Sequence, residues 1–273
     1  MKRRNIVQSL AAASLGWFWP ALALPQRTNV NIIPESLPEG FRPLKARVIG
    51  VGHAGSQLLL ETWRSRPLAP LDGSLSYAVV TGRDITGSLM KAQCNPLLGL
   101  APVQIVPIGH PMTSSREEHA RWAVETHGAV LQSLVEDVDI VCLVAGVGGA
   151  TGSAVAPVLA QMAQSVGTRV LVVIATPFQW EKGRYPHAFK AVRDLELHSD
   201  CMASLSNDMR AQVLGRSASL KDVLALQATE IADTVRRLLV VATYTRMDAE
   251  PVWGPMRLQD GINAAAASSV LSF

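Results

Sequence analysis

The chain has 273 residues, of which 48% are hydrophobic and 17% are charged, so it carries enough apolar material for one or two globular domains. Its formal net charge of +3 is small and dispersed, which argues against nucleic acid as a partner. The three cysteines, Cys94, Cys142 and Cys201, are far apart and odd in number, so neither a disulfide framework nor a zinc site is predicted. The histidines likewise show no metal-ligand spacing, and we expect no side-chain metal site.

Residues 1–26 have the layout of an export signal. A basic start, Met1–Arg4, precedes an uncharged stretch, and the small residues Ala21–Ala23 lie near the end of its apolar run. The paired arginines also resemble a twin-arginine signal, which would direct the protein to the periplasm. We nevertheless expect the domain to lie in the cytoplasm, with residues 1–26 retained as a membrane anchor. Export to the periplasm is the alternative, and a true start codon further along also stays open. The proline-rich residues 27–44 are predicted to be a linker.

From residue 45 onward, short apolar runs alternate with longer amphipathic segments. The predicted strands are 45–51, 75–81, 102–108, 139–145, 169–175 and 201–206, and the predicted helices are 57–66, 114–136, 154–165, 187–197 and 220–239. This alternation predicts an α/β fold, a Rossmann-like three-layer domain with a parallel sheet covered by helices on both faces. Ligands of such domains bind beyond the carboxyl ends of the strands.

A glycine-rich segment follows the fourth predicted strand and reads Val-Gly-Gly-Ala-Thr-Gly-Ser over 147–153. Glycine lets backbone N–H groups approach an anion, and the N-terminus of the following helix attracts negative charge. No lysine follows the glycines, so this is not a Walker motif. The candidate phosphate-binding residues here are Gly148, Gly149, Ala150, Thr151, Gly152 and Ser153.

A second glycine turn follows the first predicted strand, where Gly50-Val-Gly52-His-Ala-Gly55 matches the pattern G-x-G-x-x-G. By itself the pattern predicts a dinucleotide site and an NAD(P)-dependent oxidoreductase, or a tight turn with no ligand. A dinucleotide fold, however, needs no second glycine cradle three strands later. The candidate ligand-binding residues in this turn are Gly52, His53, Ala54, Gly55, Ser56 and Gln57.

Four motifs, in order, resemble the tubulin/FtsZ superfamily. Residues 48–57 are similar to the first glycine loop of FtsZ, 147–157 to its G-G-G-T-G-[ST]-G signature and the following A-P, 176–184 to its K-P-F-x-F-E-G-x-x-R loop, and 206–222 to its P-N-D…V-L-G-R-x-x-S-L-x-D run. The resemblance covers roughly 47–239 and implies a nucleotide-binding domain over 45–247. It implies GTP or GDP as the ligand, accompanied by Mg²⁺, with Glu181 and Arg184 at the ribose and base edge and Asn207 in the same site.

The chain departs from the family pattern at the base. The family's central helix presents an aromatic ring and an aspartate to guanine, whereas the aligned positions here are Leu224 and Thr229, with Glu230 one residue further on. A carboxylate is the natural reader of guanine's paired donors, so guanine specificity depends on whether Glu230 turns into the site. The loop expected at the γ-phosphate is replaced by Pro111–Ser115.

The loop that the resemblance assigns to GTP hydrolysis also departs from the family pattern. In the family, an N-x-D-x-x-D loop acts on the nucleotide of the next protomer, and its nearest counterpart here contains Asp248 and Glu250. These are the candidate catalytic residues, although two solvated loop acids would look the same. Residues 248–273 are interpreted as a remnant of this catalytic region and a tail.

Three functional hypotheses follow. The first is a GTP/GDP-binding FtsZ-like protein with weak or partner-dependent hydrolysis, acting in filament assembly, cell division or membrane remodelling. Its expected partners are further copies of itself or an FtsZ-like protein, with membrane association through the N-terminus. The second is a non-hydrolysing interaction module at the membrane. The third is an NAD(P)-binding oxidoreductase.

Overall fold

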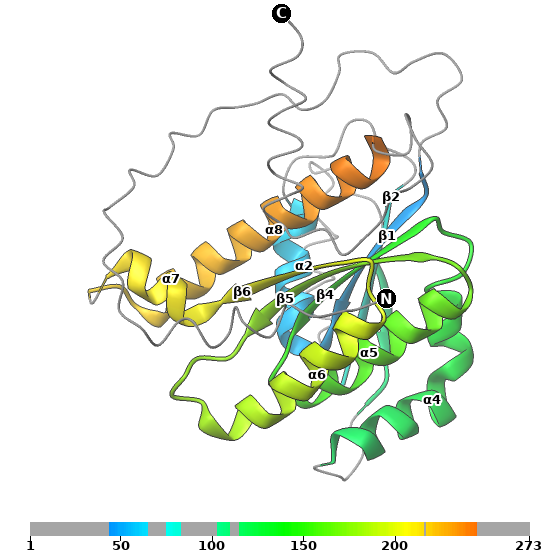
Figure 1. Ribbon diagram of the computed structural model, residues 1–273, viewed down its shortest axis with the longest axis horizontal. Coiled ribbons are helices and arrows are strands. Elements are labelled where there is room, and N and C mark those ends of the chain that lie inside the picture. The colour runs from blue at the N-terminus through cyan, green and yellow to red at the C-terminus, as the bar shows by residue number, and fades with distance from the viewer. Residues whose placement is uncertain (1–43, 65–74, 83–102, 110–114, 216, 245–273) are drawn as a thin grey trace, which may run out of the picture. The chain divides into compact units, whose positions relative to one another are not determined.

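The fold is built on a six-stranded parallel sheet with the order β3-β2-β1-β4-β5-β6 (Figure 1). It is seen in a computed structural model that describes residues 44–64, 75–82, 103–109, 115–215 and 217–244. The strands are β1 (Ala46–Val51), β2 (Leu75–Thr81), β3 (Val103–Pro107), β4 (Ile140–Gly146), β5 (Arg169–Thr176) and β6 (Cys201–Ser206). The helical elements are α2 (Gly52–Arg64), α4 (Arg116–Ser133), α5 (Ala150–Ser165), η4 (Lys182–Arg184), α6 (Tyr185–Leu197), α7 (Asn207–Leu214) and α8 (Leu220–Tyr244).

Helices cover both faces of the sheet, because the central strands are apolar on both sides. Alternate side chains of a strand point to opposite faces, and those of β4 enter two separate cores. One core is closed by α2 and α8, and the other by α4, α5 and α6 (Figure 1). The predicted three-layer α/β fold is confirmed.

The largest differences between predicted and observed helix starts lie at the glycine segments, and α8 ends five residues later than predicted, at Tyr244. Helix α2 begins at Gly52, directly after β1, rather than at residue 57, and α5 begins at Ala150 rather than at 154. Gly52 has φ +75°, a conformation that lets the chain pass from strand to helix within one residue. The two glycine segments are therefore largely the first turns of helices rather than loops.

Two further differences concern helix ends. Helix α7 was not predicted; it follows β6 without a loop, and the Ser206 side chain caps it by accepting a hydrogen bond from the Met209 N–H. Helix α4 was predicted to start at Ser114, but its N-cap is Ser115, which accepts from the Glu118 N–H. In both helices a serine hydroxyl satisfies an N–H group that has no partner inside the helix.

The predicted leader, 1–26, lies outside the described residues, as does the predicted linker apart from Leu44, which is buried in the core with α2 and α8. Within the described ranges, no helix is both long enough and apolar enough to cross a bilayer.

The close packing of α2 on the sheet yields a first prediction. A Cβ atom at Gly55 would lie 2.3 Å from the carbonyl oxygen of Val144. We therefore expect Gly55→Ala to lower the free energy of unfolding by about 1–3 kcal/mol, the usual cost of overpacking, in chemical denaturation. Gly128→Ala is the control, because a Cβ there meets only Val124 Cγ1 at 3.9 Å in the interior of α4. It should raise the free energy of unfolding by up to ~1 kcal/mol, and equal effects at the two sites would contradict the prediction.

Candidate functional site

A cavity of about 990 Å³ lies at the carboxyl ends of β1, β4 and β5. The described residues that line it come from the start of α2, the β4–α5 connection, the β5–α6 loop, the start of α7 and one face of α8. They are Val51–Ala54, Gln57, Leu58, Leu60, Gly82, Gly146–Gly152, Ala175–Phe178, Trp180, Glu181, Arg184, Asn207, Leu220, Lys221, Leu224, Ala225, Gln227 and Ala228. This is the edge at which parallel α/β sheets bind ligands.

The two glycine segments touch each other through their backbones at the floor of this cavity. A Cβ atom at Gly52 would lie 2.9 Å from the backbone nitrogen of Gly152, and one at Gly152 would lie 2.4 Å from the carbonyl oxygen of Gly146. A Cβ at Gly146 would in turn lie 2.6 Å from the Cβ of Ala54. Glycine is required at these three positions because any side chain would force the segments apart. The contact brings the N-termini of α2 and α5 to one cavity.

The G-x-G-x-x-G pattern of the first segment has a packing explanation. A Cβ at Gly50 would lie 2.7 Å from the carbonyl oxygen of Gly55, and Gly55 itself packs on β4. Together with Gly52, these glycines allow β1, α2 and the second segment to approach closely. Close packing alone therefore accounts for the G-x-G-x-x-G pattern, and the pattern is no evidence for a dinucleotide site.

The N-terminus of α5 has the properties of an anion site. The first N–H groups of a helix have no partner within it, and the N-cap Gly149 supplies no side-chain hydrogen bond. Neither α2 nor α5 has an acidic residue in its first turn. The Ser153 hydroxyl accepts a hydrogen bond of 2.8 Å from the Gly148 N–H, where the backbone has φ +143°. Backbone donors and two helix dipoles thus fit a phosphate chain.

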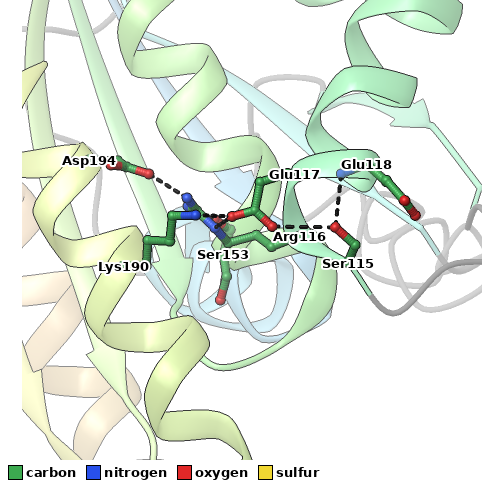
Figure 2. Close-up of polar contacts among 7 residues, drawn as sticks. All are labelled: Ser115, Arg116, Glu117, Glu118, Ser153, Lys190 and Asp194. Atoms are coloured by element: carbon green, nitrogen blue, oxygen red, sulfur yellow. Dashed lines mark hydrogen bonds and ion pairs between the residues drawn. The ribbon is translucent and has the colours of Figure 1, made fainter.

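Arg116 supports this segment from outside the cavity (Figure 2). Its guanidinium donates to the carbonyl oxygen of Ser153 at 3.1 Å and to Asp194 Oδ2 at 2.5 Å, so it joins α4, α5 and α6. Beside it, Glu117 contacts Lys190, and this hydrogen bond to the ammonium group lowers the pKa of Glu117 to about 2. The start of α5 is therefore held by a network of charged side chains that do not line the cavity.

The β5–α6 loop forms a side wall and is organised by Glu181. One carboxylate oxygen pairs with Arg184 Nη1 at 2.6 Å, and the other accepts from the Phe178 N–H at 3.0 Å. Both oxygens are therefore engaged inside the loop, whereas the Arg184 side chain is 61% exposed. The ring of Trp180 stacks on that of Phe178 with centroids 5.3 Å apart. Arg184 is the member of the pair that is accessible to a ligand.

Of the three α8 residues expected to contact the nucleotide base, only one lines the cavity. Leu224 lines the cavity, but Thr229 does not, and its hydroxyl donates to the Ala225 carbonyl oxygen at 3.1 Å. Glu230 is not on the cavity wall either and pairs with Arg210. The hypothesis that Glu230 turns into the site is therefore not what the structure shows. Thr229 lies five residues after Leu224, which is about 140° around a helix.

Two buried amides on the cavity wall have unsatisfied atoms. Asn207 is 8% exposed and Gln227 is 2% exposed, and both line the cavity. Among the residues that the structure describes, Asn207 Oδ1 and Gln227 Nε2 have no hydrogen-bond partner. Buried polar atoms in native proteins are normally paired, so these two atoms on the cavity wall are available to a ligand or to water.

The predicted site residues divide into three groups. Those on the wall are Gly52, His53, Ala54, Gln57, Gly148, Gly149, Ala150, Thr151, Gly152, Glu181, Arg184, Asn207 and Leu224. Gly55, Ser56, Ser153 and Thr229 are not on the wall; Ser56, for instance, is buried and donates to the Gly52 carbonyl oxygen at 2.6 Å. Asp248 and Glu250 lie outside the described residues, as do Pro111–Ser114.

Gln227, the polar residue of α8 on the cavity wall, was not predicted from the sequence. The family alignment pointed to Thr229, whereas helical spacing from Leu220 through Leu224 leads to Gln227 on the same face. In the part of the chain that is described, no group of three or more His, Cys, Asp or Glu side chains has the arrangement of a metal site.

The comparisons with known proteins agree with this geometry. Residues 108–215 match the Tubulin/FtsZ family, GTPase domain. The chain is 28% identical over 252 residues to the cell division protein FtsZ of Buchnera aphidicola subsp. Schizaphis graminum, covering 82% of this chain and 62% of the relative. It is 34% identical over 106 residues to FtsZ of Haemophilus influenzae, covering 38% and 25% of the two chains.

Solved structures show the same fold. The FtsZ dimer of M. jannaschii superposes with a TM-score of 0.57 at 20% identity, covering 74% of this chain and 56% of that one. The CetZ2 protofilament of Haloferax volcanii, bound to GTPγS, gives 0.58 at 22% identity, with 73% and 59% covered. The chain spans 62% and 49% of the length of two curated FtsZ relatives from Buchnera.

The Arg116 network yields a second prediction. We expect Arg116→Gln to lower the free energy of unfolding by about 2 kcal/mol in chemical denaturation, since it removes charge-assisted hydrogen bonds to Ser153 and Asp194. Arg121→Gln, on the exposed face of the same helix, should change it by less than about 0.5 kcal/mol. If the two variants unfold alike, the network does not stabilise the fold.

Proposed function

Since this chain belongs to the FtsZ/tubulin superfamily, we propose that it binds GTP or GDP in the cavity at the carboxyl ends of its strands. One observation supports this most strongly: the N-termini of α2 and α5, neither with an acid in its first turn, meet at one cavity through contacting glycine backbones. Backbone amides at two helix starts favour the negative charge of a chain of phosphates.

Each wall of the cavity has a role in this proposal. The amides of Gly52–Ala54 and Gly148–Thr151 hold the phosphates, and the exposed guanidinium of Arg184 reaches the sugar or the nearest phosphate. Helix α8 and Asn207 border the base. Mg²⁺ would be held mainly by phosphate oxygens and water, which suits its usual coordination at nucleotide sites. That a GTPγS-bound CetZ2 protofilament shares this fold is consistent with both ligand and assembly.

We also propose that copies of the chain associate and that hydrolysis is weak or depends on a partner. Asp248 and Glu250 would orient water against the γ-phosphate of a neighbouring protomer, a task of positioning and electrostatics. Residues 1–26 would anchor the domain at the membrane on the cytoplasmic side, where GTP is present. The linker would end before Leu44, which is buried in the core. This arrangement suits a role in cell division or membrane remodelling.

A non-hydrolysing interaction module is the second candidate. The observation that favours it is the position of Thr229 and Glu230, which are away from the cavity, so that the base is not read by a carboxylate of α8. Self-association that is unchanged by nucleotide would support this candidate, and nucleotide-dependent assembly would exclude it.

A charge substitution in the phosphate segment provides the third prediction. A Cβ at Gly149 meets no atom within 4 Å, and Gly149 is the N-cap of α5, where aspartate is favoured. Gly149→Asp should therefore keep the fold while placing a negative charge among the phosphate sites. In titration calorimetry with GDP and Mg²⁺, we expect affinity to fall at least about a hundredfold, as a loss of ~3 kcal/mol implies.

Gly128→Asp is the control for that substitution. A Cβ at Gly128 meets only Val124 Cγ1 at 3.9 Å, and Gly128 lies in α4, which contributes no residue to the cavity lining. Its GDP affinity should equal that of the wild type. If the wild-type chain shows no saturable GDP or GTP binding, the proposed function is wrong.

The acids after α8 provide the fourth prediction. Asp248→Asn and Glu250→Gln should each lower the rate of phosphate release from GTP at least about tenfold, the low end for a positioned catalytic group, without changing GDP affinity. Asp233→Asn, in the middle of α8, serves as the control and should leave the rate unchanged. Release that is equally slow in all three variants and the wild type would favour the non-hydrolysing module.

A further inference from the structure

We propose that Gln227 reads the base, and that the site consequently accepts adenine as well as guanine nucleotides. This inference rests on the proposed nucleotide site and adds its base specificity. It is carried by the buried amide that α8 presents to the cavity and by the engagement of the nearby carboxylates elsewhere.

Gln227 is a buried polar residue on the cavity wall, and one atom of its amide lacks a hydrogen-bond partner. It lines the cavity one helical turn beyond Leu224, is 2% exposed, and its Nε2 has no partner among the described residues. A buried donor left without an acceptor destabilises the protein. The terminal torsion of a glutamine is broad, so its amide can rotate to meet an acceptor in the cavity. An atom of a bound base would offset that cost.

The carboxylates near the cavity are committed to other contacts. Glu181 is the only acidic side chain among the described lining residues, and both of its oxygens accept hydrogen bonds within its own loop. Asp208 accepts from the Gln179 N–H with both oxygens, at 3.2 and 3.0 Å, and does not line the cavity. Glu230 pairs with Arg210. In the described part of the chain, none of these acids is therefore free to read a base.

An amide and a carboxylate select different bases. A carboxylate only accepts, so it pairs with the two adjacent donors of guanine, N1–H and the 2-amino group. An amide donates from nitrogen and accepts through oxygen, so it pairs with adenine through N6–H and N1, or with guanine through O6 and N1–H. The exocyclic 2-amino group of guanine is left unread. Gln227 therefore gives little preference between guanine and adenine. Uracil matches the amide equally well through O4 and N3–H, so a weaker affinity for UDP would come from the smaller contact area of a pyrimidine ring.

The experiment uses the full-length wild-type chain and four nucleotides: GDP, IDP, ADP and UDP, each with Mg²⁺ in titration calorimetry. IDP is guanine-like but lacks the 2-amino group. We expect the affinities for GDP, IDP and ADP to agree within about tenfold, a difference below ~1.4 kcal/mol, with UDP weaker. A preference for GDP over both IDP and ADP of a hundredfold or more would overturn the inference.

A variant tests the residue itself. Gln227→Glu replaces the donor with a second acceptor, so the preference for GDP over ADP should rise at least tenfold and IDP should fall behind GDP. Gln212→Glu makes the same chemical change on the exposed surface of α7, outside the cavity, and should leave all affinities unchanged. If Gln227→Glu does not fold, Gln227→Leu replaces it and should weaken GDP and ADP binding equally.

The outcomes separate this inference from the proposed function. Binding of none of the nucleotides by the wild type would refute the nucleotide site itself, and this inference with it. Tight GDP binding with strong rejection of IDP and ADP would uphold the site and refute the role of Gln227. A GDP-to-ADP ratio that is unchanged in Gln227→Glu would also refute it.

Discussion

The contact between the backbones of two glycine segments is the constraint on which the rest of the site depends. Gly52 at the start of α2 lies against Gly152 in the first turn of α5, and Gly152 lies against Gly146 at the end of β4. No side chain fits between these strands and helices, so the two helix N-termini meet at one place. Their dipoles and unpaired amides then act together, which a single helix start would do more weakly.

Two polar interactions hold the β4–α5 segment that makes this contact. Ser153 accepts from the Gly148 N–H, and Arg116 holds the Ser153 carbonyl oxygen from the opposite side. On the neighbouring wall, Glu181 organises its loop from within, and Asp208 ties that loop to α7. Some polar side chains that the sequence analysis assigned to the ligand, such as Ser153 and Glu181, thus make hydrogen bonds within the protein instead. Backbone donors and a few exposed side chains remain for a ligand.

The glycine side and the α8 side of the cavity differ in how tightly their residues are constrained. At the glycine side, the residues are restrained by backbone packing, and their replacement would disturb β1, β4, α2 and α5 together. At the other side, α8 presents one face of a helix, and a side chain there can change without moving the backbone. Under the proposed function, substitution is therefore easier at the residues that border the base than at those that hold the phosphates.

The sequence alone determined the fold class and the place of the site. Apolar runs alternating with amphipathic segments predict a parallel sheet with helices on both faces, and two glycine segments after strands predict an anion site at their carboxyl ends. These features are local and periodic, so they can be read residue by residue. Nine of the thirteen predicted ligand-binding residues on the cavity wall come from these glycine segments, whereas Glu181, Arg184, Asn207 and Leu224 were predicted from the resemblance to the FtsZ/tubulin family.

Only the tertiary structure decided which residues face the cavity. Ser56 and Ser153 look like phosphate-binding hydroxyls, but burial and their hydrogen bonds to Gly52 and Gly148 commit them to the backbone. Thr229 matches the family position, yet its angle on α8 turns it away from the cavity, whereas Gln227 is turned toward it. Sequence fixes which chemical groups are available. Their use depends on which neighbours the fold brings within hydrogen-bonding distance, and that is a property of elements far apart in the chain.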